Sequence, residues 1–255
     1  MCIVMLLTGC ARTSYNVATH HQEVTFTSTD KEVEMGRKLA QKVRSELKLA
    51  VDEPMQERVR AIGQKVAAVS DRHDLVYSFE VVKDDGVNAF SLPGGYVFVN
   101  EGLVKKAASD DELAAVLAHE VGHVAARHSI KRYETGIGAS IAQIAGVVAS
   151  RRSPDSRGIG VALQAALLAY ARQDELDADR LGVKYMRAAG YDPKAMLSFL
   201  EKLHKVDQDK LQYMPRGIVR PYYAMTHPYV SDRVRAVKEE LYGVADYIDY
   251  LNSPN

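Results

Sequence analysis

The stretch His119-Glu120-Val121-Gly122-His123 decides how the rest of this sequence is interpreted. Two histidines four residues apart on an α-helix lie on one face, about one 5.4 Å turn apart. Both imidazoles can then bind one metal ion, and Glu120 lies on the side where a metal-bound water would sit. As mere core residues, these groups would lose their hydration beside apolar neighbours without gaining partners. The stretch therefore predicts a zinc site.

The residues before this motif favour a helix. Ser109 with Glu112 is typical of a capping box, and Asp110 and Asp111 suit the positive end of a helix. Residues 113–118 follow as an unbroken apolar run, and we expect the helix to continue to about Arg132.

The composition is that of a globular protein, with 47% apolar and 26% charged residues among 255. Basic and acidic residues balance at 33 each, so nothing in the net charge attracts nucleic acid or anionic lipid, and we expect no nucleic-acid partner. The longest apolar runs are residues 137–149 and 159–171. Both are shorter than the ~20 residues of a membrane-spanning helix, and we interpret them as buried or capping helices.

Both cysteines, Cys2 and Cys10, lie in the first ten residues. A metal in the folded body must therefore be held by histidine and carboxylate. The sequence Leu7-Thr8-Gly9-Cys10 resembles a bacterial lipobox, although the basic start of a signal peptide is missing. The alternative is an apolar N-terminus with an incidental cysteine. We expect residues 1–29 to be a partial lipoprotein signal and polar tether, with a lipid anchor on Cys10 in the outer membrane, facing the periplasm.

The remaining chain is expected to form one domain, residues 30–255, that is predominantly helical α+β. Apolar spacing predicts helices over 30–49 and 54–69, then strands over 76–82 and 96–99, with turns at 84–86 and 93–95. The stretch 151–158 is the best candidate for a mobile loop. A helix over 159–188 follows, then one opened by Pro193, an irregular stretch over 206–223, and a last helix capped by Ser231.

The third zinc ligand must come from outside the motif, because a zinc hydrolase typically has three protein ligands plus a water. Glu175 and Asp179 share one face of a helix, while Asp177 is turned away. One of the two can ligate zinc while the other accepts a hydrogen bond from a ligand histidine.

A metzincin is excluded, because that subclass needs histidine and glycine where this sequence has Ser129 and Ala126. His128 is one place too early for the same role, and we expect it to face solvent or to support the site from behind.

Four segments resemble the zinc metallopeptidase family of HtpX, BepA and the CAAX prenyl proteases, in the family's order and over about residues 30–245. They are Asn88-Ala89-Phe90-Ser91-Leu92-Pro93-Gly94-Gly95, the motif with its extension to His128, Glu175-Leu176-Asp177-Ala178-Asp179-Arg180-Leu181-Gly182, and His227-Pro228 with Arg233. The resemblance implies a gluzincin-like fold with a small β-sheet packed on the metal-site helix. It also implies one Zn²⁺ per chain on His119, His123 and Glu175, with Glu120 as base and Asp179 in support.

The same resemblance implies that Tyr96–Val99 is an edge strand to which an extended peptide adds. The substrate-binding residues would then be Asn88, Gly95, Tyr96, Val97 and Phe98. Because the transmembrane helices of HtpX and the helical repeats of BepA are missing, the sequence is most similar to the small periplasmic lipoprotein members.

Peptide-bond hydrolysis follows, with Glu120 taking a proton from the attacking water. The oxyanion needs a donor, and the sequence leaves it open among His227, Arg233, Tyr222, Tyr223 and Tyr229.

His227 has two possible catalytic roles. As a fourth zinc ligand it would hold the enzyme latent, and as a proton-bearing donor it would stabilise the oxyanion. We expect polypeptide substrates, chiefly unfolded or misassembled envelope proteins. The rival interpretation is a zinc-stabilised chaperone or binding module for outer-membrane proteins, against which the intact Glu120 argues, since a structural site needs no base.

Overall fold

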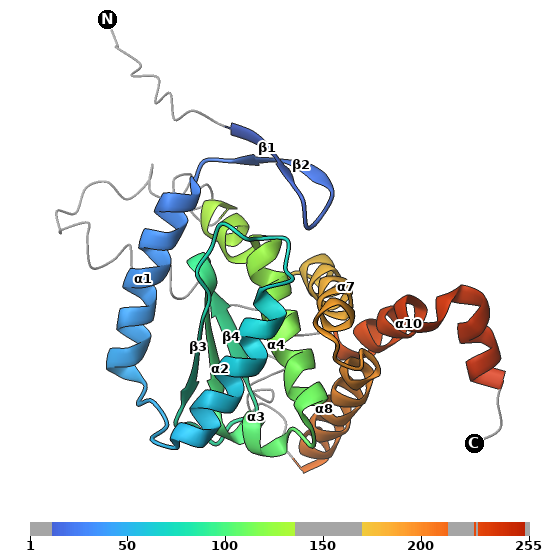
Figure 1. Ribbon diagram of the computed structural model, residues 1–255. Coiled ribbons are helices and arrows are strands. Elements are labelled where there is room, and N and C mark those ends of the chain that lie inside the picture. The colour runs from blue at the N-terminus through green and yellow to red at the C-terminus, as the bar shows by residue number, and fades with distance from the viewer. Residues whose placement is uncertain (1–11, 136–169, 214–226, 228, 253–255) are drawn as a thin grey trace, which may run out of the picture.

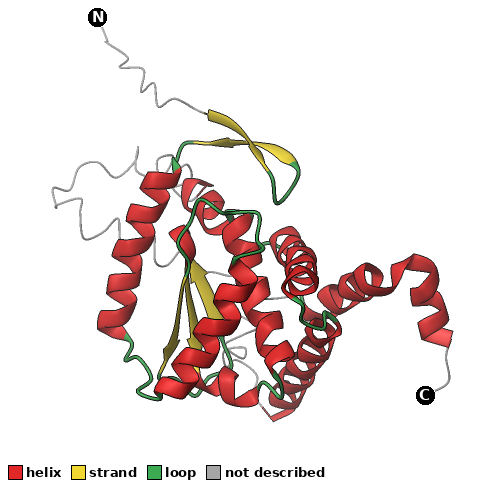
Figure 2. Cartoon of the chain, viewed as in Figure 1, coloured by secondary structure: helices red, strands yellow, loops and turns green. Residues whose placement is uncertain are grey.

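The computed structural model of this chain describes residues 12–135, 170–213, 227 and 229–252. Figure 1 shows a small sheet surrounded by helices, with a two-stranded hairpin at one end, and Figure 2 shows how helices dominate. The elements in order are β1 (Arg12–Asn16), β2 (His21–Thr25), α1 (Thr29–Glu46), α2 (Glu53–Ala67), β3 (Ser78–Val82), β4 (Ala89–Leu92), η1 (Pro93–Gly95), β5 (Tyr96–Asn100), α3 (Glu101–Lys106), α4 (Asp110–Ala125), α7 (Arg172–Ala189), α8 (Lys194–Tyr213) and α10 (Val230–Asn252).

The central sheet has the strand order β3-β5-β4, with β5 parallel to β3 and antiparallel to β4. Successive side chains of a strand point to opposite faces. Phe98 accordingly packs with Leu39 and Val43 of α1, whereas Val97 and Val99 join a second apolar cluster with α2 and α4. The sheet is therefore covered by α1 on one face and by α2 and α4 on the other, which confirms the predominantly helical α+β class.

The metal-motif helix α4 is buried on all sides, as expected for a helix that is apolar all round. The Ser109 side chain accepts the backbone N–H of Glu112, as the capping motif predicts. α4 ends at Ala125, well before the predicted Arg132. Arg127 takes a positive φ of 57° there, and a separate helical segment begins at His128.

The crossing of α4 and α7 depends on two glycines. A Cβ on Gly122 of α4 would lie 2.8 Å from the carbonyl oxygen of Ala178 on α7, and one on Gly182 would lie 3.3 Å from the backbone nitrogen of His119. Both distances are tighter than ordinary van der Waals contact. These small residues let the two backbones approach so closely that short side chains on α7 can reach the histidines of α4.

The segment predicted as a polar tether is a hairpin where the structure describes it, from Arg12 onward. β1 pairs antiparallel with β2. The Asn16 side chain donates to the carbonyl of Ala126, and Arg180 donates to the carbonyl of Ala18. Polar composition alone suggested disorder, but these polar groups find partners on the folded body.

Other boundaries also differ from the predictions. β4 and α3 were not predicted, and α8 runs to Tyr213, which makes the first part of the stretch predicted as irregular helical. α10 begins at Val230, so Ser231 lies inside the helix instead of capping it. The expected loop 151–158, the apolar run 137–149 and Cys10 lie outside the described residues. Within the described ranges, no helix combines the length and apolarity needed to cross a bilayer.

Candidate metal centre

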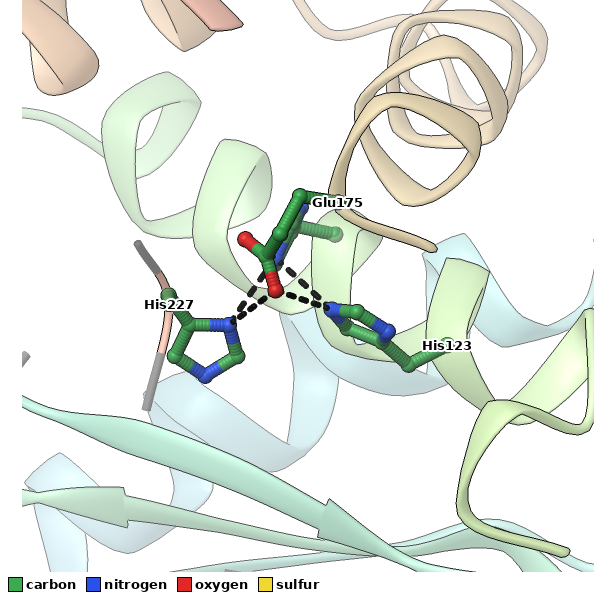
Figure 3. A group of neighbouring side chains, drawn as sticks. His123, Glu175 and His227 are labelled. Atoms are coloured by element: carbon green, nitrogen blue, oxygen red, sulfur yellow. Dashed lines mark hydrogen bonds and ion pairs between the residues drawn. The ribbon is translucent and has the colours of Figure 1, made fainter. Parts of the chain in front are cut away.

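Four buried side chains converge where α4, α7 and His227, three residues before α10, meet. His119, His123, Glu175 and His227 each offer one ligand atom, and these atoms all lie within 4.8 Å of one another. We call this set the four-donor cluster. Figure 3 shows the carboxylate of Glu175 pointing at the rings of His123 and His227. One Glu175 oxygen lies 3.2 Å from Nδ1 of His227 and 3.5 Å from Nε2 of His123. The structure thus brings together residues 108 positions apart.

His119 is oriented from behind by Asp179, one turn beyond Glu175 on α7. Its Nδ1 lies 2.8 Å from Oδ1 of Asp179. Because an ionised carboxylate can only accept, Nδ1 carries the hydrogen and donates it. Burial by itself raises the pKa of Asp179, but its contacts with Arg233 and His119 outweigh burial and hold the pKa below its ordinary value. The Nε2 of His119 faces the cluster.

His123 has a different supporting partner, His128. The two Nδ1 atoms are 2.9 Å apart, and Nε2 of His128 lies 3.6 Å from a carboxylate oxygen of Asp174. Burial, reinforced by His119, lowers the pKa of His123 well below its ordinary value, so its ring is neutral. His128 is fully buried, which rules out the solvent-facing alternative.

The Nε2 atoms of His119 and His123 face one another at 3.0 Å. When neither nitrogen carries a hydrogen, as a metal ligand requires, the two lone pairs repel at that distance, and a cation between them would remove the repulsion. The donor set, imidazole nitrogens and a carboxylate without sulfur, is one that Zn²⁺ accepts. The residues present therefore fit the zinc ion that the motif predicts.

The charge balance supports the same fit. Three fully buried carboxylates, Glu120, Glu175 and Asp179, face one buried guanidinium, that of Arg233. Arg233 lies 2.8 Å from Glu175 and forms a two-bond pair with Asp179 at 2.7 and 2.8 Å. The carboxylates therefore outnumber the guanidinium by two. A divalent cation would cancel that excess.

The pKa shifts of His227 and Glu175 also support a site for a cation. Burial opposes charge on His227, yet Glu175 and Glu120 raise its pKa above the ordinary value. Burial likewise opposes ionisation of Glu175, but Arg233 and His227 hold its pKa well below the ordinary value. The site therefore favours an ionised carboxylate and positive charge beside it.

Glu120 is the one buried acid of the site whose two oxygens both lack a hydrogen-bond partner among the described residues. Nε2 of His227 lies 3.4 Å from its Oε1. A carboxylate held in this way is free to accept a proton from a molecule that enters the site.

The substrate strand must be corrected. β5 is the central strand of the sheet, paired on both sides, so Tyr96, Val97 and Phe98 have no free edge for a peptide. Val97 and Phe98 are also fully buried, and Gly95 lies in the turn that joins β4 to β5. The mistake arose because β4 is buried on both faces and shows no alternation by which a strand could be recognised.

β4 is the edge strand beside the cluster. Asn88 gives its carbonyl to the backbone N–H of Asn100 on the central-strand side. In an antiparallel pair the next residue then turns its backbone groups outward, so the carbonyl of Ala89 points to the free edge. Nε2 of His227 lies 3.3 Å from this oxygen. His227 therefore contacts both the cluster and the strand edge.

Sequence reasoning missed the part played by Tyr170, which no motif marks. Its ring stacks on His123 with centroids 3.7 Å apart, and Arg132 lies 3.5 Å from the centroid of the same ring. The Tyr170 hydroxyl contacts the Ser129 hydroxyl at 3.1 Å. This packing fixes the plane of the His123 ring.

The candidate oxyanion donors separate in the structure. Arg233 is engaged with Glu175 and Asp179, and Tyr229 is half-exposed with a positive φ of 66°. Tyr222 and Tyr223 lie outside the described residues. Of the proposed donors that the structure describes, only His227 both touches Glu120 and belongs to the cluster.

Comparison with known proteins assigns the family. Residues 53–241 match the model of peptidase family M48. The beta-barrel assembly-enhancing protease of Yersinia pestis is 29% identical over 242 residues, which cover 88% of this chain and 48% of that protein. The mitochondrial metalloendopeptidase OMA1 of Schizosaccharomyces pombe is 32% identical over 184 residues, covering 72% of this chain and 52% of that protein. This chain thus spans about half the length of these relatives.

The matched range includes every member of the four-donor cluster as well as Glu120, Asp179 and Arg233. It also includes β4 and the whole of α4 and α7, whose close crossing builds the site. On the match over 53–241, which is well over half of its length, the chain belongs to peptidase family M48.

Proposed function

We propose that this chain is a zinc-dependent endopeptidase that hydrolyses peptide bonds of envelope proteins. The observation that carries the proposal is the four-donor cluster lying beside a buried Glu120 that lacks a hydrogen-bond partner. A purely structural zinc site needs no adjacent free carboxylate. The family assignment supports the same activity.

The proposed reaction divides its work between the ion and the residues around it. Zinc, when bound, polarises the scissile carbonyl and lowers the pKa of water toward about 7. Glu120 accepts the proton of the attacking water and returns it to the leaving amine. His119, His123 and Glu175 are the proposed ligands, held in place by Asp179, His128 and Arg233.

The proposed substrate is an extended polypeptide that adds to the free edge of β4. The outward carbonyl of Ala89 supports this, because it offers the backbone hydrogen bond that strand addition uses. The far end of this edge is closed, since the Ser129 hydroxyl lies 3.5 Å from the carbonyl of Ser91. The peptide would therefore pair near Ala89, beside Glu120.

His227 is the proposed latency device. Its Nδ1 faces the cluster, 3.3 Å from Nε2 of His119, which is the place of a fourth donor. A catalytic zinc site typically keeps that position open for water. His227 also contacts the Ala89 carbonyl at the free edge of β4. One side chain would therefore block both the fourth ligand position and the strand edge to which the substrate would add. Its departure would open both.

The proposed setting is the bacterial envelope. Relatives are named for enhancing β-barrel assembly, which supports envelope substrates, chiefly unfolded or misassembled ones. The proposed anchor is a lipid on Cys10 in the outer membrane, with the domain facing the periplasm. Palmitate labelling that is lost in Cys10→Ser tests the anchor.

The test of the activity is casein degradation by Glu120→Gln. We expect turnover to fall about 10²–10⁴-fold, because the proton acceptor is lost, while bound zinc is retained. If His227 keeps the wild type inactive, the effect of Glu120→Gln is measured in the His227→Ala variant instead. If casein is cut equally with and without Glu120, or if zinc-loaded wild type and His227→Ala both bind casein without cutting it, the proposal fails. The second result would favour a zinc-stabilised binding module.

His227 itself is tested by His227→Ala. We expect casein turnover to rise several-fold, since the fourth position and the β4 edge would both open. His21→Ala, at an exposed histidine of the hairpin, is the control and leaves turnover unchanged. A fall in turnover would identify His227 as an oxyanion donor, and an unchanged rate would remove both roles.

A further inference from the structure

The hairpin of β1 and β2 reverses the usual polarity of a surface strand pair. Tyr15, Val17, Val24 and Phe26 are between 53% and 60% exposed, and we call these four residues the outer face. The register places Thr13 opposite Val24 and Tyr15 opposite Gln22, so these side chains share one side of the ribbon. None of the six carries a charge. Such an exposed apolar ribbon face marks an interaction site.

The opposite side of the hairpin is polar and fixed to the body. Asn16, Glu23 and Thr25 alternate with the outer face and point inward. Glu23 pairs with Lys131 at 2.7 Å, and the Thr25 hydroxyl donates to Glu134 at 3.0 Å. These contacts hold the apolar side outward.

The position of the hairpin indicates what binds the outer face. It lies at one end of the molecule, outside the helices that enclose the sheet (Figure 1). Tyr15 follows Cys10 by five residues, which is at most about 18 Å of extended chain. A lipid on Cys10 would therefore keep the outer face within reach of the bilayer surface. The nearby cation Lys131 is already paired, so the outer face suits a neutral surface.

We propose that the outer face of the hairpin rests in the interface of a lipid bilayer and sets the orientation of the domain above the membrane. Tyr is suited to such a place, because its ring is apolar and its hydroxyl stays in water. Binding would depend on apolar area and little on anionic lipid or salt. This inference rests on one part of the proposed function, the lipid anchor on Cys10, because the anchor would bring the hairpin to the membrane. It does not depend on the proposed peptidase activity.

The experiment uses the full chain carrying Cys10→Ser, so that no lipid contributes. Cosedimentation with phosphatidylcholine vesicles compares this protein with the additional changes Tyr15→Ser, Val24→Thr and Phe26→Ser. We expect the triple change to weaken vesicle binding at least about tenfold, with no effect of adding salt. The matched control is Val51→Ser with Val76→Ser, at two side chains that are 95% and 88% exposed elsewhere on the surface, and it should leave binding unchanged.

Circular dichroism and zinc content of each variant check that the fold persists. Equal vesicle binding by the triple variant and its parent would overturn the proposal. The proposal would also be overturned if the triple variant lost self-association and kept its vesicle binding, because the outer face would then contact a second copy of this chain. Casein turnover measured on the same proteins reports the proposed activity separately, and palmitate labelling of the Cys10 form reports the anchor separately.

Discussion

Two polar clusters lie beside the C-terminal half of helix α4, and they differ in charge balance. The four-donor cluster and its neighbours contain three carboxylates and one guanidinium. At the C-terminal turn of α4, Glu32 contacts Arg127 at 3.0 Å and Arg72 at 3.4 Å, and Arg72 also pairs with Asp74 at 2.7 Å. We call these four residues the Glu32 cluster. Its two acids and two bases cancel.

The difference separates a structural cluster from a binding one. The Glu32 cluster ties α1 to the loop at Thr27, whose carbonyl accepts from Arg127, and to Gly94 in η1. Its charges balance without any ligand. In the four-donor cluster and its neighbours the carboxylates outnumber the guanidinium, and the ligand atoms converge within 4.8 Å, so this cluster favours a cation. Substitutions should therefore affect stability at one cluster and metal binding at the other.

The largest effect should come from Glu32→Gln. Removing one member of a buried ion pair leaves its partners without compensation, and we expect the free energy of unfolding to fall by about 3 kcal/mol. The two clusters share no side-chain partner, so zinc affinity of the folded chain should change by less than about threefold. Denaturant unfolding and zinc titration measure the two quantities. A large loss of zinc with unchanged stability would reverse the assignment of the clusters.

A smaller effect is expected for Asp179→Ala in the four-donor site. The hydrogen bond that fixes the tautomer of His119 is lost, and zinc affinity or turnover should drop about 10–100-fold. Asp177→Ala is the control on the same helix, because that side chain accepts from Gln173 outside the cluster. Competition with a chelator gives the affinities. Equal zinc affinity in Asp179→Ala and wild type would show that Asp179 does not support His119.

The features of the fold and the site that could be predicted from the sequence are those that depend on residues close together in the chain. The i,i+4 spacing of His119 and His123, and of Glu175 and Asp179, is a property of one helix turn, and it placed both pairs correctly on their faces. The cap at Ser109 is local as well. Arg233 meets Asp179 across 54 residues, and nothing in either segment encodes that pairing.

The errors share a physical cause. β4 is buried on both faces and lacks a period, so β5 was mistaken for the edge. The hairpin at residues 12–25 has a polar side that is satisfied only by distant groups such as Lys131 and Ala126. Its composition resembles a tether because those partners are not in the segment. Tyr170 owes its place at His123 to stacking alone.

Metal analysis tests the central claim most directly. The chain is loaded with zinc and dialysed, and zinc per chain is measured for wild type, Glu32→Gln and the double change His119→Ala with His123→Ala. We predict about one zinc in wild type and in folded Glu32→Gln, and none in the double variant, because two of its ligands are gone. Wild type without zinc, or a double variant that retains it, would contradict the account.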